Sequence, residues 1–154
     1  MHPSNEEFLH FDICLDRLQS AWKTLTTIKQ HQGHPLVVPS FRFALVEYAA
    51  PYTRSDGEHK RYSLDTHYVP PEFMDLHRRL VSSRHQVHAH SDLTVLEASV
   101  TFIDLPDQRL VTTVQNYGQE VEELDNIDEI ILLLEATLRG MSTDRDRRKQ
   151  LLEP

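Results

Sequence analysis

The sequence has a single cysteine, Cys14, among its 154 residues, so an internal disulfide is excluded. This cysteine usage is typical of proteins of the reducing cytosol. Cys14 lies within a helix-like apolar pattern, which favours a buried structural thiol. The sequence also lacks an apolar run long enough to cross a bilayer, and no basic stretch followed by an apolar block opens it. We therefore expect a cytoplasmic protein with no membrane contact.

Glycine and positive charge are scarce as well. The four glycines form no phosphate-cradling loop, and 16 Lys and Arg face 24 Asp and Glu, for a net charge of −8. Because phosphate contacts need clustered cations, a chain this acidic is a poor general binder of nucleic acid. Any RNA contact must come from a local basic site. A basic partner protein is the other interpretation of this charge.

Hydrophobic spacing predicts a mainly α fold, a helical bundle of about four main helices with a small β-hairpin before the last. The first two helices are expected at residues 5–29 and 40–50, with a loop at 30–39 between them. An exposed irregular connection follows at 51–69. The third helix is expected to start at Pro70 and Pro71 and to run to about His90.

The segment after this helix changes its pattern. Residues 96–102 alternate apolar and polar side chains, and residues 109–117 are rich in β-branched ones, which predicts a hairpin of half-buried strands. A last helix is expected at 119–139, with Gly140 as its stop signal. Residues 1–140 would then form one domain, and residues 141–154 a charged, mobile tail.

Histidine is abundant: there are ten, and three of them lie between residues 85 and 90. On a helix, Arg84 would share a face with His77 and His88, whereas His90 would point about 120° away from Arg84. His90 can face the same space only if the helix ends or distorts near Ala89, or if a second chain contributes. A solvated helix end, with the arginine capping carbonyls, explains the same residues without any site.

Arg84 and His90 together would suit one reaction. Arginine presents a planar fork of donors that matches a phosphate, and histidine takes or gives a proton near neutral pH. Such a pair can hold a phosphodiester and activate the neighbouring ribose 2′-hydroxyl. That route cleaves RNA without a metal.

The run from Leu76 to Asp92 resembles the motif of HEPN proteins, which are helical proteins found among toxins, abortive-infection factors and CRISPR-associated nucleases. Their signature is an arginine, often followed by a polar residue, and then a histidine after a short spacer. Arg84, His85 and His90 match it, and the segment from Ala89 to Asp92 looks like its usual ending. Residues 43–52 resemble an earlier helix of the abortive-infection branch, so the likeness covers about residues 40–92.

The resemblance implies a HEPN-like bundle and a metal-independent endoribonuclease, a toxin or phage-defence effector, that needs no cofactor. Arg84 would bind the scissile phosphate, and His90 would act on the 2′-hydroxyl or the leaving group. His77, His85, His88 and Asp92 would support them. Family members pair two chains so that both motifs line one cleft, which implies a homodimer that acts on RNA. An antitoxin or a nucleotidyltransferase is the further partner implied.

Other functions stay open. A non-catalytic HEPN-like dimeric module would bind RNA, a nucleotide or a partner protein through the same residues, and a structural interaction protein would have no site at all. His85, His88, His90 and Asp92 would form a metal cluster only on a strand or loop, because His88 and His90 diverge on a helix. No cysteine pair and no His-Glu-x-x-His pattern is present, so we expect no metal.

Overall fold

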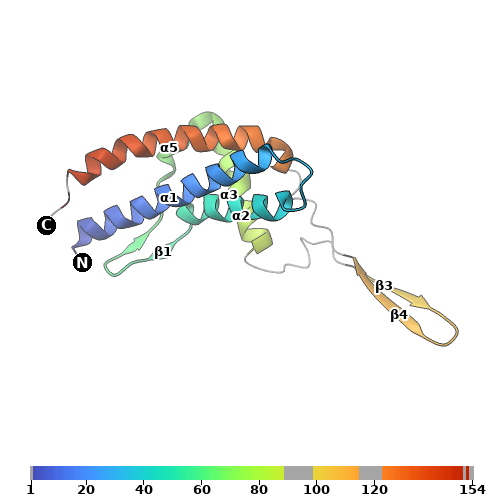
Figure 1. Cartoon of the computed structure of the whole chain (residues 1–154). Helices are drawn as coiled ribbons and strands as arrows, with labels where there is room; N and C mark the ends of the chain where they lie inside the picture. Colours follow the sequence, from blue (N-terminus) through green and yellow to red (C-terminus); the bar gives the residue numbers. More distant parts are fainter. Residues whose placement is uncertain (1, 89–98, 115–122, 151, 153–154) are drawn as a thin grey trace.

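The computed structural model describes residues 2–88, 99–114, 123–150 and 152, and this part of the chain is mainly helical (Figure 1). Its α-helices are α1 (Pro3–Lys29), α2 (Val37–Ala49), α3 (Met74–His88) and α5 (Ile127–Lys149). Its strands are β1 (Ser55–Asp56), β2 (Arg61–Tyr62), β3 (Ser99–Asp104) and β4 (Arg109–Val114), and its 3-10 turns are η1 (Ala50–Tyr52), η2 (Thr66–Tyr68), η3 (Pro71–Phe73) and η4 (Glu123–Asn126). The predicted mainly helical fold with a hairpin before the last helix is confirmed.

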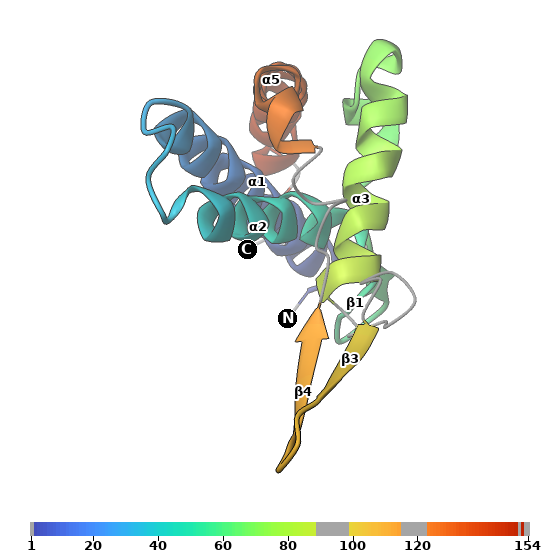
Figure 2. The same ribbon diagram turned by 90° about the vertical axis from the view of Figure 1, so that its right-hand side faces the viewer.

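Helix α1 is the centre of the bundle because its apolar residues recur every three or four positions and form one buried stripe. It packs against both α2 and α5, while α3 runs across α2 (Figures 1 and 2). Helices α1 and α5 are antiparallel. The Nε1 of Trp22 donates to the carboxylate of Glu135 at 3.1 Å, and Arg145 pairs with Asp12 at 2.5 Å. The core draws on all four helices through Leu18, Leu25, Phe41, Leu45, Leu80, Ile130 and Leu134.

The segment between α2 and α3 is not the exposed irregular connection that the sequence predicted. It forms the β1–β2 hairpin and the three 3-10 turns η1, η2 and η3, and it buries Leu64, Tyr68 and Val69 against the helices. The carboxylate of Glu6 holds this hairpin on α1 by accepting hydrogen bonds from the backbone N–H groups of Glu58 and His59 and from the Tyr62 hydroxyl. A Cβ at Gly57 would lie 2.5 Å from Oε1 of Glu6, so only glycine allows this close approach. The local sequence contains nothing that reveals a partner 50 residues away.

Helix α3 begins at Met74, after the η3 turn, and its last described residue is His88. The hairpin that follows pairs Ser99 with Val114 through to Asp104 with Arg109, and the N–H of Leu105 donates to the carbonyl of Gln108 at 2.8 Å to close it. This hairpin and its turn therefore agree with the sequence pattern over the described residues, while residues 96–98 and 115–117 of the predicted strands lie outside them. The expected burial of one face of the hairpin is wrong, because described apolar side chains on both faces are exposed in the single chain.

The last helix continues past Gly140 to Lys149, where the sequence predicted a stop and a mobile tail. Met141 is fully buried, and Asp144 accepts a hydrogen bond from the Tyr68 hydroxyl. The apolar contact and the ion pairs of this last part of α5 outweigh the small helix propensity that one glycine loses. Among the described residues, no helix is both long and apolar enough to cross a membrane.

Candidate functional site

Arg84 lies on the last part of α3, four residues before the end of the described helix. It is partly buried, and within the described part of the chain its Nε atom is buried without a hydrogen-bond partner. A buried guanidinium N–H that has lost its water and gained no acceptor is unfavourable, so most such groups in proteins have a partner. Arg84 thus carries a donor without an acceptor among the described residues, which is compatible with its predicted role in holding a phosphate.

His77 lies seven residues before Arg84, on nearly the same face of α3. It is buried, shares a 2.8 Å hydrogen bond between its Nδ1 and the hydroxyl of Tyr48, and meets the ring of Tyr52 edge-on at 4.5 Å. Desolvation, helped by the neighbouring charge of Arg78, lowers the pKa of His77, so the ring is neutral at pH 7. His77 therefore belongs to the core and positions α3 on α2.

The remaining predicted residues of this site cannot be placed beside Arg84. His85 and His88 are part of the helical backbone of α3, but their side chains lie outside the described residues. His90 and Asp92 lie wholly outside them. The structure thus brings His77 and Arg84 onto one helix face, and the pairing of Arg84 with His90 stays a prediction.

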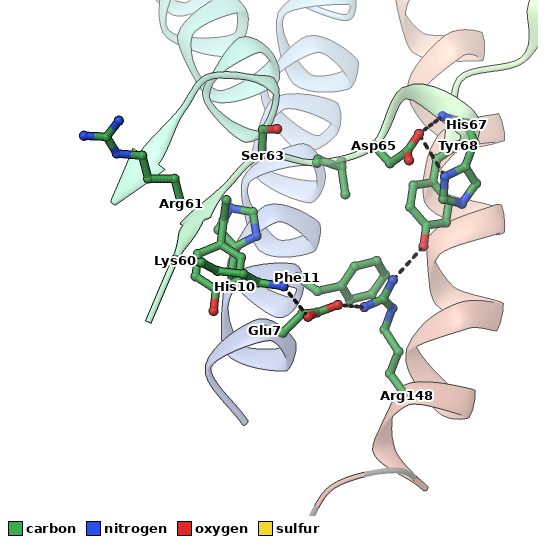
Figure 3. Close-up of a pocket in the computed structure, with 12 residues that line it drawn as sticks. Glu7, His10, Phe11, Lys60, Arg61, Ser63, Asp65, His67, Tyr68 and Arg148 are labelled. Atoms are coloured by element: carbon green, nitrogen blue, oxygen red, sulfur yellow. Dashed lines mark hydrogen bonds and ion pairs between the residues drawn. The ribbon is translucent and has the colours of Figure 1, made fainter. Parts of the chain in front are cut away.

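A polar cavity of about 340 Å³ lies between α1, the β1–β2 hairpin, η2 and α5 (Figure 3). Glu7 sits between two cations there, 2.8 Å from Lys60 and 3.5 Å from Arg148. The Nε of Arg148 also pairs with Asp144 at 2.8 Å, and its guanidinium lies over the ring of Phe11 at 4.5 Å. Sequence reasoning missed this cavity because its lining comes from four separate segments.

The charged groups of this cavity neutralise one another. Desolvation raises the pKa of Asp144, but hydrogen bonds from Tyr68 and Arg148 outweigh it and lower that pKa to about 2. Asp144 is therefore ionised across the physiological range and keeps Arg148 paired. Arg61 extends away from the cavity and pairs with Asp56 instead (Figure 3). The ion pairs of the cavity join the first part of α1 to the last part of α5, and Lys60 and Arg148 are already engaged by acids of the same chain.

Other reactive groups support no second site. Burial raises the pKa of the Cys14 thiol to about 11, so Cys14 is an unreactive buried thiol in contact with the ring of His10 at 3.6 Å. Desolvation lowers the pKa of His10, whose ring stacks on that of Tyr62 with centroids 5.0 Å apart. In the part of the chain that the structure describes, no group of three His, Cys, Asp or Glu side chains is placed to hold a metal ion.

Comparison of the chain with models of protein families, with curated proteins and with solved structures gives no match. Arg84 carries a buried donor that has no acceptor among the described residues, whereas Lys60 and Arg148 of the cavity pair with carboxylates.

Proposed function

We propose that this chain is a metal-independent endoribonuclease of the HEPN type, in which Arg84 binds the scissile phosphate and His90 moves the proton. The observation that carries the proposal is the buried Nε of Arg84, which lacks an acceptor among the described residues. The mainly helical fold, with Arg84 near the end of α3, is the setting that the resemblance leads one to expect. A toxin or defence role and a homodimeric cleft belong to the same proposal.

The reaction needs no external reactant. The ribose 2′-oxygen attacks phosphorus, the bond from phosphorus to the 5′-oxygen breaks, and a 2′,3′-cyclic phosphate and a 5′-hydroxyl result. Imidazole can accept the 2′ proton or deliver one to the leaving oxygen. The arginine fork stabilises the extra negative charge on the phosphoryl oxygens, a role in which one donor contributes about 10²–10³-fold to the rate.

The test is cleavage of a labelled single-stranded RNA in the presence of a metal chelator. We expect the wild-type chain to cut, and Arg84→Ala and His90→Ala each to lose about 100-fold or more of the rate. Arg84→Lys keeps the charge but loses the bidentate fork, so it should restore only part of that rate. The matched control is Arg78→Ala, because Arg78 lies on the same helix but is exposed and paired with Asp75.

Two outcomes would contradict the proposal. Cleavage that the chelator abolishes would point to a metal-dependent reaction. Cleavage that survives Arg84→Ala at the wild-type rate would remove Arg84 from the site. RNA binding that needs Arg84, without cleavage by any variant, would favour the non-catalytic binding module.

A further inference from the structure

The β3–β4 hairpin is a two-stranded ribbon that no other described strand extends. It stands away from the helices in both views (Figures 1 and 2). Apolar side chains along both strands are about half exposed, among them Phe102 at 60%, Val111 at 58% and Val100 at 55%. Isolated two-stranded ribbons are marginal in water, and they gain stability from further strands or from packing on an apolar surface. This hairpin therefore has the apolar composition of a buried element, although its apolar side chains are exposed in the single chain.

The edges of the hairpin carry none of the usual protection against pairing. Charge is confined to its closed end, at Asp104, Asp107 and Arg109, and residues 99–103 and 110–114 contain no charge, proline or glycine. Proteins with solvent-exposed sheet edges protect these edges against pairing with another strand by placing lysine, proline or bulges there. Their absence here indicates that these strands meet another surface.

The strand register decides which apolar side chains share a face. Phe102 lies opposite Val111, and Val100 lies opposite Thr113, so Phe102, Val111 and Val100 share one face. We call this the Phe102 face. Arg109 bounds it at the closed end, where its guanidinium pairs with Asp104 at 2.5 Å and lies 5.8 Å from the centre of the Phe102 ring. The opposite face carries Thr101 opposite Thr112 at its centre and Ile103 opposite Leu110, which are less exposed, at 47% and 45%.

We propose that the Phe102 face is a self-association surface, on which the hairpin of a second copy of this chain packs. Charge favours this occupant. Residues 99–114 have a net charge of −1, against −8 for the whole chain, so two hairpins can meet where repulsion between the copies is weakest. The one arginine of the hairpin is already paired with Asp104, so this face offers no cation for an RNA phosphate. Its apolar side chains complement the same face of a copy related by a two-fold axis.

The size of this surface sets the strength of the contact. A phenylalanine side chain buries about 150–250 Å², so Phe102 and its two valine neighbours offer on the order of 300 Å² per copy. A stable interface of standard size buries about 800 Å² per partner. We therefore expect a reversible dimer whose population rises with concentration over the micromolar range.

Analytical ultracentrifugation over a concentration series tests the proposal, and its readout is mass, independent of RNA cleavage. We expect Phe102→Lys to raise the dimer Kd at least tenfold. The matched control is Phe43→Lys, since Phe43 on α2 is 51% exposed and should leave Kd unchanged. Equal helical circular dichroism in the three proteins shows that each is folded. A wild-type chain that stays monomeric throughout, or equal effects of the two substitutions, would overturn the proposal.

Oxidative cross-linking tests the face itself. Val111→Cys lies on the Phe102 face and Thr112→Cys lies on the opposite one, and both positions are exposed. We expect Val111→Cys to form disulfide-linked dimers much faster than Thr112→Cys. The wild-type chain, whose buried Cys14 is retained in both variants, should form none. Equal cross-linking at the two positions would show that the Phe102 face is not the contact.

Discussion

At the scale of single residues, the pair of Tyr48 and His77 shows how a polar contact can fix the placement of a site. His77 contacts residues of both α2 and η1, so it holds α3 in register beneath Arg84. Burial raises the pKa values of Tyr48 and Tyr52, which keeps both phenols protonated and able to donate. If His77 were protonated, its charged ring would be shielded from water. Its Nδ1 could then no longer accept a hydrogen bond from the Tyr48 hydroxyl.

We expect the free energy of unfolding to fall as the pH drops below about 6.5, in part because of His77. Its pKa is lowered in the folded chain, so the unfolded chain binds more protons in this window and acid favours unfolding. Urea denaturation followed by circular dichroism between pH 7.5 and 5.5 measures the effect. His77→Gln keeps a polar side chain that does not titrate, so its stability should vary less with pH. Equal pH dependence in the two proteins would show that His77 contributes nothing.

At the scale of elements, helix α5 shows how tertiary contacts override a local stop signal. Gly140 is not at a helix end and makes no close backbone approach: a Cβ there would lie 3.7 Å from the ring of Tyr68, an ordinary contact distance. The glycine therefore contributes only flexibility to the unfolded chain. Met141 beside it is fully buried and anchors the last turns of the helix.

We expect Gly140→Ala to raise the free energy of unfolding by about 0.5–1 kcal/mol, because alanine loses less backbone entropy in a helix. Met141→Ala should lower it by about 2–5 kcal/mol, through lost burial and the cavity left behind. Ser142→Ala, at an exposed position of the same helix, serves as the control and should change little. Chemical denaturation of the three variants measures all of these changes. A destabilising Gly140→Ala would mean that this helix needs the glycine.

The elements that could be predicted from the sequence are those whose apolar pattern repeats within a few residues. The stripe on α1 and the strands of the β3–β4 hairpin repeat within a few residues, so their existence could be inferred. The β1–β2 hairpin could not, because Glu6 holds it from 50 residues away. The same limit applies to the candidate site: spacing placed Arg84 and His77 on one face, but only the fold shows that His77 is engaged by Tyr48. Periodicity also cannot distinguish a strand that packs within its chain from one that packs on a second copy.

At the scale of the whole molecule, the charge of −8 is distributed so that most described cations are ion-paired within the chain. Arg79 pairs with Glu123 at 2.7 Å, Arg17 with Glu47 at 2.9 Å, and Arg148 with Asp144 and Glu7. In the described part of the chain, the buried Nε of Arg84 has no hydrogen-bond partner. The molecule therefore repels RNA over much of its surface, and its attraction for phosphate must be local.

For the proposed nuclease, this distribution predicts a weak salt dependence of RNA binding. Each phosphate contact on a single strand contributes a slope of about −0.7 to log K against log salt. A chain whose contact is Arg84 should therefore show a slope near −0.7, or about −1.4 if two copies each supply one arginine to the same RNA. Fluorescence anisotropy with a 2′-O-methyl RNA, which cannot be cleaved, measures this slope. Arg84→Ala should reduce the magnitude of the slope by about 0.7 per arginine, and Arg78→Ala should leave the slope unchanged.

A slope several times steeper in the wild-type chain would require many more phosphate contacts than one arginine per chain provides. The RNA would then lie along a basic surface, and a site centred on Arg84 would not account for the binding.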